Sequence, residues 1–106
     1  MITAKQAVDD LIFVALEDDS IVGAVMAGYD GHRGWIYAVA VDHAHRRNGI
    51  ARRLVAHALD ALSQLGCIKT NLQIRSDNRQ VIAFYQSLRF QIEDRISMGL
   101  ILPRPA

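Results

Sequence analysis

The chain has 106 residues, of which 51% are hydrophobic and 22% are charged, and its formal net charge at pH 7 is +1. This composition predicts one folded domain over residues 1–106 and argues against a disordered segment. The near-neutral charge excludes a general attraction to nucleic acid or to an acidic membrane surface, and no run reaches the ~18 apolar residues of a membrane span. The single cysteine, Cys67, and an N-terminus without a signal-like apolar core lead us to expect a cytoplasmic protein.

The first half of the chain predicts three antiparallel strands in a meander. Residues 1–10 are expected to hold one helical turn or more, but the segment is too short to show a clear period. The strands are expected at residues 11–16, 21–29 and 35–41, joined by short polar turns. The first of these strands is therefore expected at the edge of the sheet, with open hydrogen-bonding groups and uncovered apolar surface. A homodimer would be one way to cover it.

The second half predicts a helix at residues 49–65 that ends at Gly66, followed by an alternating strand at residues 67–75. Strand, helix and strand in this order form a right-handed parallel unit. A second helix is expected at residues 79–88 behind the capping residues 76–78. A final pair of strands is expected at residues 90–92 and 95–102, before a tail at residues 103–106.

A strand, a polar loop and a helix start meet between residues 35 and 51. The first-turn N–H groups of a helix and the positive end of its dipole attract anions, and Gly49 would let a ligand approach the backbone closely. Arginines flank this turn at Arg46, Arg47, Arg52 and Arg53. The pattern favours a phosphate-bearing ligand, but it lacks the lysine and glycine spacing of a P-loop and the three glycines of a dinucleotide site. A plain arginine-rich helix start is the alternative.

The remaining reactive side chains give weaker signals. The four histidines have no metal-ligand spacing, so we expect no metal. His43 and His45 are expected to face solvent, and the Asp42 side chain is expected to bond the loop backbone. We expect Cys67 to be a small buried hydrophobe.

Two motifs together carry a family resemblance. Arg46-x-x-Gly49-x-Ala51 after a strand, followed by Asn78 and by Ala83-Phe84-Tyr85-x-x-Leu88-x-Phe90, resembles the acetyl-CoA-binding core of the GNAT (Gcn5-related) N-acetyltransferases. Residues 28–35, 66–75 and 93–99 look more narrowly like its YpeA-type bacterial subgroup. The resemblance covers roughly residues 11–100. It implies an α/β (α+β) acyl-CoA N-acyltransferase fold, in which a mixed sheet has an antiparallel meander followed by a βαβ unit.

The resemblance also implies an activity and a set of site residues. An amine acceptor, either a small molecule or a peptide, would attack the thioester of acetyl-CoA directly in a ternary complex, without a metal. The backbone of Val39, Ala40 and Val41 would pair with the pantetheine, and an N–H near Val41 would stabilise the oxyanion. The Arg46 side chain would lie at the loop entry, and the N–H groups of Arg47, Asn48, Gly49, Ile50 and Ala51 would hold the pyrophosphate. Asn78 would touch the pantetheine, and the Tyr85 hydroxyl would protonate the leaving thiolate.

Three features of the sequence depart from the family pattern. Only residues 1–10 precede the 11–16 strand, where the family has a strand and two helices that cover the acceptor side. Gln73 replaces the glutamate of relatives that acetylate protein N-termini, which leaves Asp30 and His32 as base candidates by elimination. Arg89 stands where the family has glycine.

Several alternatives stay open at this stage. Tyr85 could be a core tyrosine, Asn78 could be only a helix cap, and Tyr37 could line the acceptor pocket. The whole chain could also be a CoA-binding or interaction module without turnover.

Overall fold

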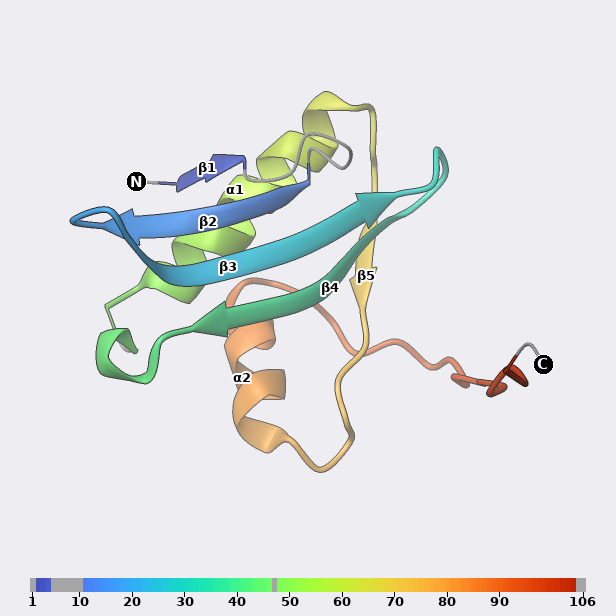
Figure 1. The fold of residues 1–106 in the computed structure, drawn as a ribbon. Coiled ribbons are helices and arrows are strands. Elements are labelled where there is room, and N and C mark those ends of the chain that lie inside the picture. Colours follow the sequence, from blue (N-terminus) through green and yellow to red (C-terminus); the bar gives the residue numbers. More distant parts are fainter. Residues whose placement is uncertain (1, 5–10, 47, 105–106) are drawn as a thin grey trace. The chain divides into compact units, whose positions relative to one another are not determined.

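The computed structural model describes residues 2–4, 11–46 and 48–104. The chain divides into two compact units, residues 1–75 and residues 76–106. The first unit is built on a five-stranded sheet with the strand order β1-β2-β3-β4-β5 (Figure 1). Its elements are β1 (Ile2–Ala4), β2 (Ile12–Glu17), β3 (Ser20–Tyr29), β4 (Gly34–Val41), η1 (His43–His45), α1 (Ile50–Gln64) and β5 (Thr70–Leu72). The second unit contains α2 (Arg79–Ser87).

The predicted meander is confirmed, because β2, β3 and β4 pair antiparallel in sequence order. The edge of the sheet was predicted wrongly. Residues Ile2–Ala4 form β1 and pair antiparallel with β2 in the register Ile2↔Ala15 to Ala4↔Phe13. This short strand covers the edge of β2 from Phe13 to Ala15. Periodicity could not reveal it, because three residues are too few to show a period.

A two-residue turn, Asp18 and Asp19, joins β2 to β3. Both residues have positive φ, 50° and 66°, as the tight hairpin turns that match strand twist require. The turn places Glu17 opposite Ser20 in the last pair of the hairpin. The Glu17 side chain therefore leaves from a fixed point at the end of the sheet.

Strand β4 contains a bulge at Tyr37. Met26 of β3 is opposite Ala38, and Ala27 is opposite Ile36, so Tyr37 has no partner across the pair. A bulge bends its strand and increases the local twist. The strand therefore changes direction near its middle.

The bulge coincides with the point at which β4 and β5 separate. The parallel pairing runs only from Gly34↔Thr70 to Ile36↔Leu72, and Figure 1 shows the two strands diverging beyond it. This explains why β5 ends at Leu72, whereas alternation predicted a strand over residues 67–75. Ile68, which was predicted to be part of this strand but lies outside β5, is 94% exposed.

Helix α1 lies across one face of the sheet (Figure 1) and buries the core of the first unit. The sequence of this helix repeats apolar residues at helical spacing, from Ile50 to Leu65. Leu65 is exposed, and the buried members of this stripe are Leu54, Val55, Ala58 and Leu62. Gly66, at a φ of 94°, ends the helix as predicted: its N–H bonds Ser63, and the N–H of Cys67 bonds Leu62. Cys67 is buried, as expected.

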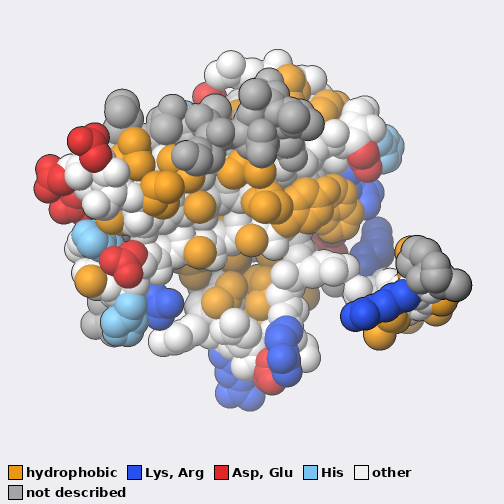
Figure 2. Space-filling view, viewed as in Figure 1, with side chains coloured by type: hydrophobic (Ala, Val, Ile, Leu, Met, Phe, Trp, Pro, Cys, Tyr) orange, Lys and Arg blue, Asp and Glu red, His pale blue; other side chains and the backbone are white. Residues whose placement is uncertain are grey.

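The opposite face of the sheet carries exposed apolar side chains. Figure 2 shows hydrophobic groups gathered over β2, β3 and β4. Of the residues on β3 and β4, Ile21, Met26 and Tyr37 are 54%, 43% and 62% exposed. This face has an apolar character that a soluble sheet usually covers.

In the second unit α2 begins behind Asn78, close to the predicted bounds. Arg89 has a φ of 75° and closes the helix with an N–H bond to Gln86. The expected strands at residues 90–92 and 95–102 are wrong, because the structure has no strand among residues 88–104. A strand requires a hydrogen-bonding neighbour, and the described part of this unit offers only one helix.

Candidate functional site

The open edge of β4 is the first component of the site. Asp42 donates its N–H to the Val22 carbonyl at 2.7 Å, and Val41 is opposite Gly23. Because successive N–H groups of a strand point to opposite edges, the N–H and C=O of Val39 and Val41 face away from β3. They face the edge that β5 leaves after Ile36. Of the three predicted residues on this strand, Ala40 instead directs its backbone to β3, opposite Ala24.

The helix start is the second component, and it is reached through η1 within the same unit. Gly49 is the N-cap of α1 with φ 76° and ψ 9°, a conformation that disfavours any residue with a Cβ. A Cβ built there would have no heavy atom within 4 Å, so the space beside it is open. No side chain caps the helix at this residue. The first turn of α1 therefore presents backbone N–H groups beside open space, as an anion site needs.

Positive charge surrounds this helix start. Arg46, Arg52 and Arg53 are exposed, and Arg46 has an extended backbone, with φ −67° and ψ 153°. Asn48 and Gly49 are also exposed, whereas Ile50 and Ala51 are half-buried. Arg47, the other predicted residue of the loop, lies outside the described residues. The described arginines strengthen the field of the helix dipole at this point.

A cluster of three ionisable side chains, Glu17, Asp42 and His45, lies immediately before the loop. The His45 ring is 2.9 Å from the Asp42 carboxylate through Nδ1 and 3.0 Å from the Glu17 carboxylate through Nε2. The expectation that His45 faces solvent is therefore wrong. Within the described residues the Asp42 carboxylate bonds the His45 ring, whereas a bond to the loop backbone was expected. Glu17 and His45 are too far apart in the sequence for pattern analysis to pair them. His43 is exposed, as expected.

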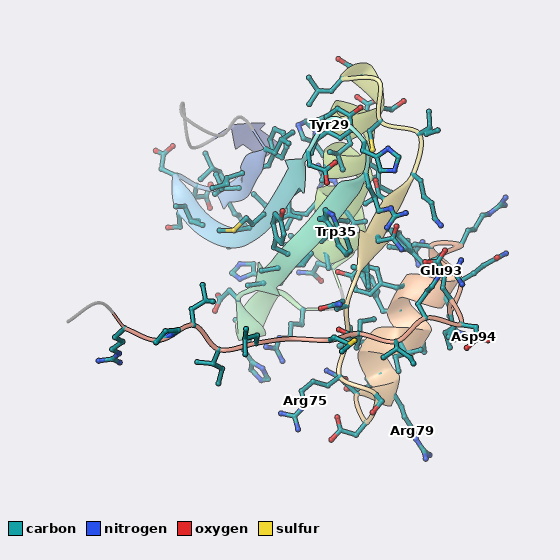
Figure 3. The ribbon with its side chains drawn as sticks, turned by 90° about the vertical axis from the view of Figure 1, so that its right-hand side faces the viewer. Tyr29, Trp35, Arg75, Arg79, Glu93 and Asp94 are labelled. Carbon is teal, nitrogen blue, oxygen red and sulfur yellow. The ribbon has the colours of Figure 1, made fainter. Side chains whose placement is uncertain are left out.

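Asn78 acts as the N-cap of α2. Its Oδ1 accepts the N–H of Val81 at 3.3 Å, so the capping role weighed at first is present. The side-chain NH₂ is the group left for another partner. Arg79 follows in the first turn and projects away from the helix (Figure 3).

Tyr85 is the one buried residue of α2, with 8% of its surface exposed. Its ring makes edge contacts with Phe84 and Phe90, at centroid distances of 5.0 Å and 5.4 Å. Burial raises the pKa of the Tyr85 hydroxyl above its ordinary value. The group is therefore a neutral proton donor throughout the physiological pH range.

The two base candidates belong to the β3–β4 turn. Asp30 accepts the backbone N–H groups of His32 at 2.8 Å and Arg33 at 2.7 Å. The bond from Arg33, followed by the bond from His32, lowers the pKa of the Asp30 carboxyl. A carboxylate stabilised in this way is a poor proton acceptor, so its geometry is that of a turn-forming residue. Gln73, which follows β5, is an amide and cannot serve as a base.

The described residues lack two features. Among residues 2–4, 11–46 and 48–104, no three His, Cys, Asp or Glu side chains are grouped to hold a metal ion. In the same part of the chain neither helix is long and apolar enough to cross a membrane.

The sequence of the chain is similar to a known family of proteins. The profile of the acetyltransferase (GNAT) family matches residues 3–90. An acetyltransferase of Yersinia pestis (strain Pestoides F) is 40% identical over 90 residues, which are 85% of this chain and 64% of that protein. The chain thus spans less than two thirds of that relative's length.

Solved structures agree on the fold. Ard1 from Thermoplasma volcanium matches with a TM-score of 0.75 and 27% identity, over 79% of this chain and 57% of that one. The NatC complex, solved with a Gag peptide and CoA, matches with a TM-score of 0.69 and 26% identity, over 74% and 56%. The mixed sheet, the two helices and the family match agree, and the chain belongs to the GNAT family of acetyltransferases.

Proposed function

We propose that the chain binds acetyl-CoA and transfers its acetyl group to a primary amine in a ternary complex. The carrying observation is the open edge of β4 at Val39 and Val41, which leads into the uncapped helix start at Gly49. An extended pantetheine arm can pair with such an edge as an added strand does. Its diphosphate then reaches the N–H groups from Asn48 to Ala51, with Arg47 as a further proposed contact.

Each remaining site residue has a proposed role. Arg46 neutralises phosphate charge at the loop entry, and the NH₂ of Asn78 donates to the pantetheine. The outward N–H of Val41 stabilises negative charge on the thioester oxygen during attack. Tyr37, which bulges from β4 and is exposed, is a candidate for the acceptor side.

The proposed reaction forms one bond and breaks one. The amine nitrogen bonds to the acetyl carbonyl carbon, and the carbon–sulfur bond then breaks. Tyr85 gives its proton to the leaving thiolate, and the proton lost by the amine restores the hydroxyl through solvent. The products are an acetylated amine and the free thiol of CoA.

A matched pair of glycine substitutions tests the cofactor site. Gly49→Ala and Gly31→Ala each place a Cβ at positive φ, 76° and 87°, with no atom within 4 Å, so their backbone strain is alike. We expect only Gly49→Ala to weaken acetyl-CoA binding, by at least tenfold in calorimetry, because its Cβ occupies the ligand's approach. Equal affinities of the two variants would contradict the assignment.

Turnover is tested separately by thiol release over a panel of amines and peptides. Release that depends on the acceptor supports the transferase. Binding without such release would instead favour a CoA-binding or interaction module, which the relatives' greater length keeps as the second candidate. The NatC structure, which holds a Gag peptide, supports including peptides in the panel.

We also propose that the chain acts as a single cytoplasmic domain that forms a homodimer and does not bind nucleic acid or membranes. The support for association is the exposed apolar face at Ile21, Met26 and Tyr37. Sedimentation at micromolar concentration should show a dimer, and a clean monomer would remove this part of the proposal.

A further inference from the structure

We infer that His45 is a positioning residue. Through Glu17 and Asp42 it ties the loop between η1 and α1 to the sheet. The inference rests on the proposed function, since it concerns the loop that would hold the diphosphate. Both ring nitrogens of His45 are within 3.0 Å of a carboxylate oxygen. A neutral imidazole donates from one nitrogen only, so both contacts are hydrogen bonds only when the ring is a cation.

The sheet holds the backbones that carry the two carboxylates. Glu17 ends β2 beside the two-residue turn and is opposite Ser20. Asp42 is held to β3 by its N–H bond to Val22 at 2.7 Å. His45 thus joins the β2–β3 hairpin to the end of β4, and Arg46 begins the loop at the next residue.

The backbone of the 3₁₀ turn supports the same role. The His45 N–H bonds the Asp42 carbonyl at 2.8 Å, and the Arg46 N–H bonds the His43 carbonyl at 3.3 Å. His45 is half-buried, with 26% of its side chain exposed, whereas His43 in the same turn is exposed. Since the side chain and the backbone of His45 are both held, the direction in which the chain enters the loop is held too.

The test compares His45→Gln with His43→Gln, which removes an exposed histidine from the same turn. For His45→Gln we expect faster amide hydrogen exchange from Asp42 to Gly49 and about three- to tenfold weaker binding of 3′-dephospho-CoA. That probe keeps the diphosphate and lacks the 3′-phosphate, so its affinity reports on the diphosphate site. The kcat at saturating acetyl-CoA should change less than twofold, because His45 is not placed at the reacting atoms.

A double variant completes the design. Glu17→Gln should add little to His45→Gln, because both remove the same contact. Identical behaviour of the two histidine variants would overturn the inference. Failure of the wild type to bind the probe, with normal exchange differences, would overturn the proposed function and leave the tie intact.

Discussion

The ring of Tyr37 lies against Gly28, so closely that a Cβ on Gly28 would be 2.7 Å from Cε2 of the ring. Gly34 is equally crowded, since its Cβ would be 2.8 Å from Cys67 Sγ and 2.8 Å from Thr70 Oγ1. The two glycines differ in what can move. Tyr37 is 62% exposed and can swing away, whereas Cys67 is buried.

Gly34→Ala should therefore lower the free energy of unfolding by about 1–3 kcal/mol, as overpacking does. Gly28→Ala should stay within about 1 kcal/mol of the wild type, because alanine favours the strand and offsets the displaced ring. Chemical denaturation measures both. An equal loss in the two variants would show that Tyr37 is held more firmly than its exposure indicates.

Arg89→Gly should stabilise the protein. Arg89 has a φ of 75°, where a residue with a Cβ is disfavoured by about 1–2 kcal/mol, and part of the gain is offset by the greater freedom of glycine in the unfolded chain. We expect a net gain of about 0.5–1 kcal/mol in denaturation. Gly66→Ala is the opposite change at a φ of 94° and should lose about 1 kcal/mol. If Arg89→Gly instead lowered the free energy of unfolding, the arginine side chain would stabilise the protein by more than its backbone strain destabilises it.

Tyr85→Phe should lower kcat by about a hundredfold, as the loss of a general acid does, with little change in acetyl-CoA affinity. The ring contacts with Phe84 and Phe90 remain, so the fold should be kept. Steady-state kinetics with the best acceptor of the panel measures the effect. Tyr29→Phe is the control and should keep the wild-type kcat. If Tyr85→Phe also keeps the wild-type kcat, Tyr85 belongs to the core alone.

The raised pKa of Tyr85 also predicts the direction of a stability change. The folded state holds this proton more tightly than the unfolded state does. The contribution is thus fully present below the ordinary tyrosine pKa and is lost as the pH rises through the folded value. Thermal melts above pH 10 should show the wild type losing stability faster than Tyr85→Phe, and parallel curves would contradict the assignment.

Asp30→Asn tests the turn at the end of β3. The lowered pKa of Asp30 means that the wild type gains from the ionised carboxylate above its unfolded pKa and loses this gain as the pH falls through the folded value. Melting curves of the two proteins should therefore converge in acid. A constant difference between pH 2 and pH 7 would show that the charge is not what the turn uses.

The sequence predicted those parts of the fold that repeat a local pattern. The α1 stripe of Leu54, Val55, Ala58 and Leu62 has a helical period, and Gly66 marks its end, so both were predicted within a residue or two. The hairpin turn was visible in Asp18 and Asp19. Gly49 was singled out because the lack of a Cβ lets a ligand approach the backbone, and the structure adds that it has the left-handed conformation of the N-cap of α1.

The errors concern features that depend on a distant partner. Residues 2–4 became a strand because β2 offered an edge. Residues 95–102 alternate like a strand but have none to pair with in their unit. The pairing of Glu17 with His45 depends on how a hairpin and a loop meet, which no period in the sequence records.

In the proposed complex, the outward backbone of Val39 and Val41 makes ligand recognition independent of side-chain identity. Any residue except proline offers the same N–H and C=O at these positions. Substitutions there can retune the packing against α1 while a bound main-chain partner is still read in the same way. Drift of the amino-acid sequence along this strand is thus compatible with an unchanged cosubstrate, and new acceptor preferences can arise elsewhere without disturbing it.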